Sequence, residues 1–156
     1  MERDNTGRIS FSKKPIPVPI SYRPMYKISE IILILKIACI KETSSLLKLH
    51  LFSWAFKSDE NTNVLRRYIE NGFQGNFEVW GIEPSLNRAL QFVLAEGLCG
   101  MTKDKKYKLT LRGSNFFEFL VKDEELFKDE KLFLKFVGKT KITDSRISEM
   151  SKSWVV

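Results

Sequence analysis

The chain has 156 residues, of which 43% are hydrophobic and 12% aromatic, a composition that predicts a packed domain and excludes an intrinsically disordered chain. The formal net charge is +7, with 26 Lys and Arg against 19 Asp and Glu. A basic excess of this size is compatible with a nucleic-acid partner and equally with an acidic protein partner.

No segment predicts secretion or a membrane span. Met1–Ser12 is polar and lacks the apolar core of a signal peptide. The apolar run Ile31–Ile40 contains Lys36 and is far shorter than the roughly 20 residues that a spanning helix needs. Cys39 and Cys99 are too few for a disulfide framework. We therefore expect a soluble cytoplasmic protein with two reduced, buried thiols.

The basic residues are concentrated in two segments. Residues 1–27 contain six basic and two acidic residues, for a net charge of +4. Lys103–Arg112 contains five basic residues and one aspartate, which again gives +4. The rest of the chain is therefore close to neutral.

Residues 1–24 are predicted to form an extended, proline-rich arm. Pro15, Pro17 and Pro19 occupy every second position, which removes backbone donors and favours a polyproline-like conformation. Two interpretations remain open: a strap over the surface of the domain, or a segment that docks on a partner.

Three helices are predicted next. Ser29–Ile40, with Ser29 as its cap, is apolar on nearly every side and must be buried in a core or in an interface. A second helix follows Thr43-Ser44-Ser45 and carries His50, which has no companion at metal-ligand spacing and is expected to be a surface or hydrogen-bonded histidine. After a polar loop over Lys57–Thr62, Asn63–Glu70 forms the third helix, and Phe77–Ile82 a short strand.

The segment Pro84–Val121 is the most informative. Ser85 is predicted to cap an amphipathic helix that Gly97 ends, because glycine is favoured just after a helix. Leu98–Met101 and Tyr107–Leu111 then predict two strands joined by a polar turn, and Gly113-Ser114 opens an aromatic helix.

This order of elements, with the phrases "AEGL" and "YKLTLRG", resembles the second half of a winged helix-turn-helix domain. The resemblance implies a mainly α fold with a small β-hairpin (α+β), in which Ser85–Glu96 is the recognition helix and Lys103–Lys108 the wing. Winged helices bind DNA, RNA or proteins, so the fold alone does not define the function. The candidate DNA-binding residues are Arg88, Lys103, Lys105, Lys106, Lys108 and Arg112.

The C-terminal part is predicted to be helical. Asp123–Lys139 forms an amphipathic helix with Phe127 and Phe133 on its apolar side, and Ile142–Val156 a weaker helical tail that ends near Trp154. The predicted division is therefore an arm over 1–24, a winged-helix domain over 25–122 and a C-terminal helical extension over 123–156.

Catalytic chemistry is not expected. The chain has one histidine and no sequence motif for a metal, a nucleotide or a nucleophile. The carboxylate groups at Asp59-Glu60 and Asp123-Glu124-Glu125 are expected to be solvated or to face helix N-termini. We predict no enzyme activity, no cofactor and no metal.

The order of four phrases, "RPMYKISEIILILKIAC", "SSLLKLHLFSWAFKS", "PSLNRALQFVLAEGL" and "KYKLTLRG", resembles the small middle component of three-component ABC-ATPase systems, including the Lamassu type of anti-phage defence. The resemblance runs from Arg23 to Gly138. It implies a bacterial, non-enzymatic subunit of a hetero-oligomer that bridges an SMC- or Rad50-like ATPase and an effector, often a nuclease. The complex would sense foreign or unusual DNA, and the subunit would contact double-stranded DNA directly or through the complex. The candidate partner-binding residues are Pro15, Pro17, Pro19, Ile31, Ile34, Leu35, Phe127, Phe133 and Trp154.

The alternative is a free-standing dimeric winged-helix transcriptional regulator with the predicted recognition helix in the major groove. That helix offers few polar side chains, which disfavours sequence-specific base contacts. They are Ser85, Asn87, Arg88, Gln91 and Glu96.

Overall fold

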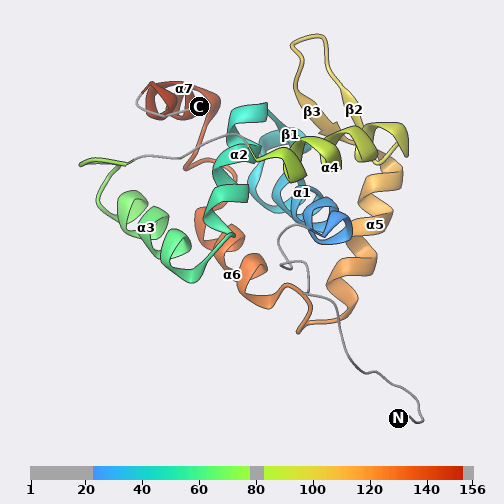
Figure 1. Cartoon of the computed structure of the whole chain (residues 1–156), viewed down its shortest axis with the longest axis horizontal. Helices are drawn as coiled ribbons and strands as arrows, with labels where there is room; N and C mark the ends of the chain where they lie inside the picture. Colours follow the sequence, from blue (N-terminus) through green and yellow to red (C-terminus); the bar gives the residue numbers. More distant parts are fainter. Residues whose placement is uncertain (1–22, 78–82, 153–156) are drawn as a thin grey trace, which may run out of the picture.

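The computed structural model of the chain describes residues 23–77 and 83–152. Within these ranges the protein is mainly helical, with one small antiparallel sheet, so the α+β class is confirmed (Figure 1). Most of the predicted arm, residues 78–82 of the predicted strand, and Trp154 lie outside the described residues.

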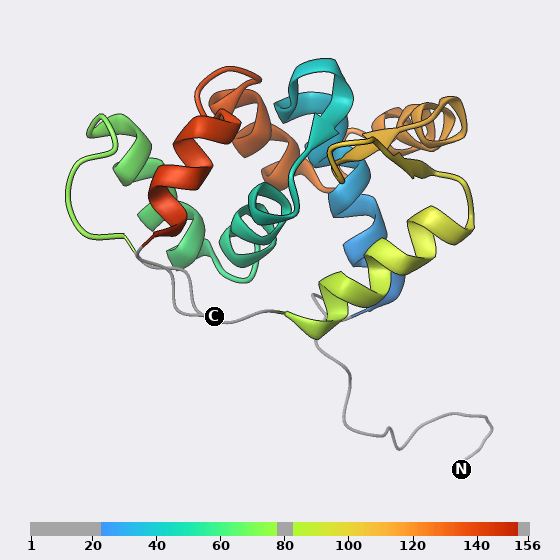
Figure 2. The ribbon, with the colours of Figure 1, turned by 90° about the horizontal axis from the view of Figure 1, so that it is seen from above.

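Helix α1 (Pro24–Ala38) lies at the centre of the fold, as Figures 1 and 2 show from two directions. It begins at Pro24. Proline is tolerated at this position because the amide groups of the first turn have no hydrogen-bond partner within the helix, so the missing N–H costs nothing. Ser29, the expected cap, lies inside the helix and is buried, so that prediction is wrong.

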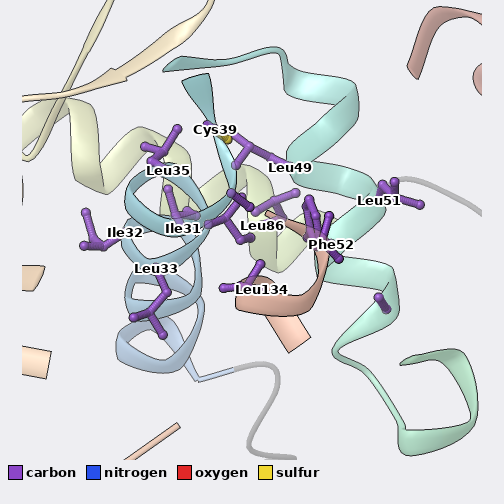
Figure 3. Close-up of a cluster of buried hydrophobic side chains, with 14 of the residues drawn as sticks. Ile31, Ile32, Leu33, Leu35, Cys39, Leu49, Leu51, Phe52, Leu86 and Leu134 are labelled. Carbon is purple, nitrogen blue, oxygen red and sulfur yellow. The ribbon is translucent and has the colours of Figure 1, made fainter. Parts of the chain in front are cut away.

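The apolar circumference of α1 is covered on all sides. Its residues from Ile31 to Leu35 are at most 1% exposed. Figure 3 shows Ile31 and Leu35 of α1 near Leu49 and Phe52 of α2 (Leu46–Ala55), with Leu86 of α4 and Leu134 of α6 closing the cluster. Burying one such side chain is worth roughly 1.5–3 kcal/mol, so α1 supplies a large part of the core rather than an interface.

Serine caps explain two of the helix starts. The Ser45 hydroxyl accepts a hydrogen bond from the Lys48 amide in the first turn of α2. Ser58 does the same for Asn61 in α3 (Asp59–Glu70), which therefore begins four residues before the expected Asn63, inside the predicted polar loop. The loop prediction is corrected accordingly, while the predicted end of α3 at Asn71 is confirmed.

Helix α4 (Pro84–Ala95) also begins at a proline, with Glu83 in place of the expected Ser85 as its N-cap residue. Gly97 follows the helix with φ +72°, a left-handed conformation that confirms its predicted role. The chain continues into β2 (Cys99–Met101), a turn, and β3 (Tyr107–Leu109).

The sheet has a third strand that the sequence analysis did not predict. After the short 3₁₀ turn η2 (Ile40–Glu42), β1 (Thr43–Ser44) pairs antiparallel with β3, opposing Thr43 to Lys108. The strand order is β1-β3-β2, so β3 is central and β1 and β2 form the two edges.

Helix α5 (Leu111–Lys122) is joined closely to the end of α4. The Thr110 hydroxyl accepts from the Gly113 amide and also lies 2.6 Å from the Gly97 carbonyl oxygen. A Cβ atom at Gly113 would lie 2.2 Å from the Leu98 carbonyl oxygen, so only glycine permits this approach. The residues of the "LTLRG" phrase thus fix α5 against the hairpin.

The predicted helix over Asp123–Lys139 is wrong in its first turn. Phe127 has a left-handed backbone with φ 54°, and α6 starts after it, at Lys128–Val137. Phe133, Leu134 and Val137 of α6 enter the same core as α1. The last described helix is α7 (Asp144–Ser151), with Ile147 and Met150 buried.

Both cysteines and the histidine are buried. Cys39 and Cys99 are free thiols. His50 is 9% exposed on α2, so of the two predicted alternatives, a surface or a hydrogen-bonded histidine, the first is wrong. None of the described helices has the length and apolar character to span a lipid bilayer.

Candidate nucleic-acid interface

The N-terminal end of α4 is fixed by a buried ionic network. The Lys27 ammonium of α1 lies 2.7 Å from one Glu83 oxygen and donates to the Ser53 hydroxyl of α2, which in turn donates to Glu83. Lys57 lies 3.4 Å from the other Glu83 oxygen. Removing one partner of a buried ion pair leaves an uncompensated charge, so this network holds α4 against α1 and α2.

The two glutamates near Lys27, Glu83 and Glu30, have pKa values shifted in opposite directions. Burial raises the pKa of Glu83, but its hydrogen bonds from Lys27 and Ser53 and the charges of Lys27 and Lys57 outweigh burial and hold that pKa below the ordinary value. Glu30 is 1% exposed, and neither of its oxygens forms a hydrogen bond with a described residue. Burial raises the pKa of Glu30 to about 8 against the opposing effect of Lys27, which lies 3.3 Å away.

At the other end of α4, Gly97 and Thr110 connect the helix directly to the hairpin and to α5. The apolar positions Leu86, Ala89, Leu90 and Val93 face the core, and the opposite side of α4 is exposed. This exposed side carries Asn87, Arg88 and Gln91, which can all donate hydrogen bonds to phosphate or base oxygens. Figure 1 shows the hairpin projecting from the body just beyond the C-terminal end of this helix.

The hairpin is built by a polar turn. The Thr102 amide donates to the Lys106 carbonyl, and the Lys106 amide donates to the Thr102 hydroxyl, which closes the turn predicted over Thr102–Lys106. Lys103 and Lys105 lie on the turn and Lys108 lies on β3, all three exposed. None of the three forms an ion pair with a described residue, so their charges remain available to an anionic partner.

Two of the predicted basic residues are already engaged. Lys106 forms a short ion pair with Asp144 at the start of α7. This ion pair joins the hairpin to α7. Arg112 lies in the first turn of α5, 3.7 Å from Glu96. This contact is exposed, and such pairs contribute little to stability, so Arg112 stays accessible.

Several other lysines hold helix ends instead of forming a surface patch. Lys131 is buried and donates to the carbonyl oxygens of Leu120 and Asp123 at the C-terminal end of α5. Lys48 donates to Ala38 at the end of α1. Cations are favoured at helix C-termini, so part of the basic excess serves the fold, a use that residue counts did not reveal.

Most of the predicted partner-binding residues that the structure describes are not at the surface. Ile31, Ile34, Leu35 and Phe133 are at most 1% exposed and form the core, which corrects their assignment to an interface. Phe127 is half-buried, with its ring 5.0 Å from that of Tyr26. Pro15, Pro17, Pro19 and Trp154 lie outside the described residues.

The exposed apolar side chains are different ones. Leu111 and Phe119 of α5 are 78% and 59% exposed, and Leu132 of α6 is 56% exposed. Helical spacing relative to the buried Leu120 and Phe133 could have placed these three residues on the outer faces. The partner-binding residues predicted from the sequence instead included three from the apolar segment Ile31–Ile40.

Comparison of the chain with models of protein families, with curated proteins and with solved structures found no match. Among the described residues, no group of three or more His, Cys, Asp or Glu side chains is placed to hold a metal ion. The site is therefore characterised by its own geometry: an exposed polar face of α4, followed by a hairpin with three unpaired lysines.

Proposed function

We propose that this protein is a non-catalytic, winged-helix DNA-binding protein that contacts duplex DNA through α4 and the β2–β3 hairpin. The observation that carries the proposal is the continuity of the exposed face of α4 with Lys103, Lys105 and Lys108 on the hairpin. DNA-binding domains with such an arrangement commonly place the helix in the major groove and the basic hairpin on adjacent phosphates.

The order of elements supports the winged-helix part of the proposal. Helix α1, the edge strand β1, helix α2, the exposed helix α4 and the hairpin follow one another along the chain, and β1 completes the sheet beside the hairpin. Helix α3 is an additional element between α2 and α4. Cofactor chemistry has no part in the proposal.

The character of α4 favours binding without strong sequence preference. Its exposed face has one arginine and two amide side chains, together with Phe92, which is 44% exposed. Sequence-specific recognition helices use several bidentate Arg, Asn or Gln contacts to base edges. We therefore expect phosphate contacts to supply most of the affinity.

We further propose that the protein acts as a subunit of a larger cytoplasmic assembly, as its resemblance to the middle component of ABC-ATPase defence systems implies. In that setting its partners are an SMC- or Rad50-like ATPase and an effector subunit. The exposed Leu111, Phe119 and Leu132 support this proposal, because large apolar side chains at the surface are used in protein interfaces.

The test of DNA binding is fluorescence anisotropy with a short duplex of arbitrary sequence, repeated over a series of salt concentrations. Replacing Lys103, Lys105 and Lys108 with alanine should lower the slope of log K against log salt by up to about 2.7, since each lost phosphate contact removes about 0.9. The matched control replaces three exposed lysines elsewhere, Lys122, Lys128 and Lys152, and should leave the slope unchanged.

Equal slopes for the hairpin variant and the wild type would contradict the proposed interface. The free-standing regulator is distinguished by its own signature, a strong preference for one duplex sequence and a stable homodimer. The subunit proposal predicts similar affinity for unrelated duplexes, and co-purification from the native host with a coiled-coil ATPase identified by mass spectrometry.

A further inference from the structure

A pocket of about 470 Å³ lies between the hairpin turn and the start of α7, and the proposed DNA contacts on α4 and at Lys103, Lys105 and Lys108 are not part of its lining. It is lined by Thr43 of the edge strand β1, by the Thr102–Lys106 turn, by η2, and by the segment that leads into α7. We call it the lysine pocket, because four of its lining residues are Lys41, Lys48, Lys106 and Lys139.

Positive charge in the lysine pocket is not balanced by the acidic groups beside it. The two acidic residues of the lining are Asp104 and Asp144. Asp144 is occupied by Lys106. Lys41, Lys48 and Lys139 form no ion pair with a described residue, so three ammonium groups border one pocket with Asp104 as the remaining carboxylate. Like charges gathered in this way repel one another, and an anion in the pocket would relieve that repulsion.

Helix capping accounts for only part of this arrangement. Lys48 is 4% exposed and donates to the Ala38 carbonyl at 2.7 Å, while Lys139 donates to the carbonyls of Lys36 and Cys39. An ammonium has three N–H donors, so capping leaves donors free on both. Lys41 caps nothing among the described residues, and it is displayed from a left-handed backbone with φ 54°.

The remaining lining groups suit phosphate. Thr102 and Thr143 also line the pocket, and their hydroxyls accept backbone amides, which leaves the hydroxyl hydrogens for an anion. Thr43 lines it too, but its hydroxyl donates to the Lys41 carbonyl. Helix α7 begins beside the pocket, with the positive end of its dipole. Lysine is a common phosphate ligand that acts as a point charge, whereas bidentate carboxylate recognition uses arginine. No arginine of the described residues lines this pocket.

We propose that the lysine pocket binds the phosphate groups of a small phosphorylated molecule, independently of the DNA contacts proposed for α4 and for Lys103, Lys105 and Lys108. The volume is sufficient for a diphosphate or a nucleotide. The position of the pocket between the hairpin and α7 means that the ligand would contact both elements, next to the ion pair of Lys106 with Asp144.

The test is isothermal titration calorimetry of the full chain with inorganic phosphate, pyrophosphate and ATP, in buffers matched for ionic strength with sodium chloride. The main variant is Lys41→Asn, because asparagine tolerates the left-handed backbone and removes the charge. Lys41→Asn combined with Lys139→Gln is the stronger variant. The matched control is Lys103→Gln with Lys105→Gln on the hairpin turn.

We expect pyrophosphate or ATP to bind the wild type and the hairpin control alike, and the affinity to fall about tenfold or more in the double pocket variant. Lys41→Asn alone should weaken binding in the same direction, which covers the case in which loss of Lys139 disturbs the end of α1. Tighter binding of ATP than of pyrophosphate would show that the third phosphate or the nucleoside adds contacts, and equal binding would show that a diphosphate suffices.

Three results would overturn the proposal. One is the absence of binding beyond the effect of sodium chloride. Another is unchanged affinity in both pocket variants. The third is displacement of bound duplex DNA by pyrophosphate in the wild type but not in the pocket variants, which would make the pocket part of the DNA surface. DNA binding that fails in the hairpin variant with phosphate binding intact would refute only the proposed DNA interface.

Discussion

Glu30→Gln should change how the stability of the protein depends on pH. Glu30 is buried on α1, and burial raises its pKa from 4.5 to about 8. The folded protein therefore binds a proton here that the unfolded chain releases above pH 4.5. The contribution of Glu30 to the free energy of unfolding is therefore fully present below pH 4.5, and it is lost progressively as the pH rises towards 8.

The magnitude follows from the size of the shift. A shift of about 3.5 pH units at roughly 1.4 kcal/mol per unit corresponds to a loss on the order of 5 kcal/mol between pH 4.5 and 8. A domain of this size has about 5–15 kcal/mol in total. Glutamine keeps the shape of the protonated carboxyl and cannot ionise, so the variant should not share this loss.

The measurement is urea denaturation of wild type and Glu30→Gln at intervals from pH 5.5 to 8. We expect the difference in unfolding free energy to move in favour of the variant by about 3 kcal/mol over this range. Burial lowers the pKa of His50, but His50 is present in both proteins, so its contribution cancels in the difference. The matched control is Glu118→Gln on the exposed face of α5. Parallel curves for wild type and Glu30→Gln would show that Lys27 keeps Glu30 ionised, and would refute the reasoning.

Two further predictions test the faces of α4 and the approach of α5. Leu90→Ala should cost about 2–5 kcal/mol in a denaturation experiment, as truncation of a buried leucine usually does, whereas Arg88→Ala should leave stability nearly unchanged and weaken DNA binding. Equal destabilisation by both would mean that the faces of α4 are assigned wrongly. Gly113→Ala should lower stability by about 1–3 kcal/mol or more, because the added methyl group meets the Leu98 carbonyl. Gly100→Ala, whose methyl group meets nothing within 4 Å, is the matched control for thermal unfolding.

Helix ends that are set by a single capping residue could be predicted from the sequence. Ser45 at the start of α2 and Gly97 at the end of α4 act through their own backbone and side-chain chemistry, so their roles follow from the sequence. Thr110 and Gly113 belonged to a recognisable phrase, although their actual contacts with Gly97 and Leu98 emerge only in three dimensions. The order of helices and hairpin was predictable for this reason.

Features that depend on distant partners were not predictable. The strand β1 has two residues and exists because β3 lies beside it. Phe127 breaks the expected helix although no glycine or proline marks the position, and its ring lies against Tyr26, far away in the chain. Similarly, the burial of Lys27 and Glu30 on α1 requires Glu83 and Ser53, so a charged pair that would be expected at a surface lies in the interior.

The basic residues of the candidate site could be predicted from the sequence, but which of them are already paired with acidic residues could not. All the basic residues of Lys103–Arg112 were identified, yet Asp144, the partner of Lys106, lies in a helix of the predicted extension. The four lysines of the pocket come from separate segments of the chain, and no local pattern connects them.

The central position of α1 has a consequence for synthesis on the ribosome. Helix α1 is the first described helix to be made. Part of its cover arrives with α6, where Glu130 accepts a hydrogen bond from Tyr26 of α1, which lies 104 residues earlier in the chain. Until then the apolar helix α1 is only partly covered, and contacts between such distant segments slow folding and favour aggregation. Helix α6 is therefore required to complete the fold, and the nascent chain has the greatest need of chaperones during the translation of α2–α5.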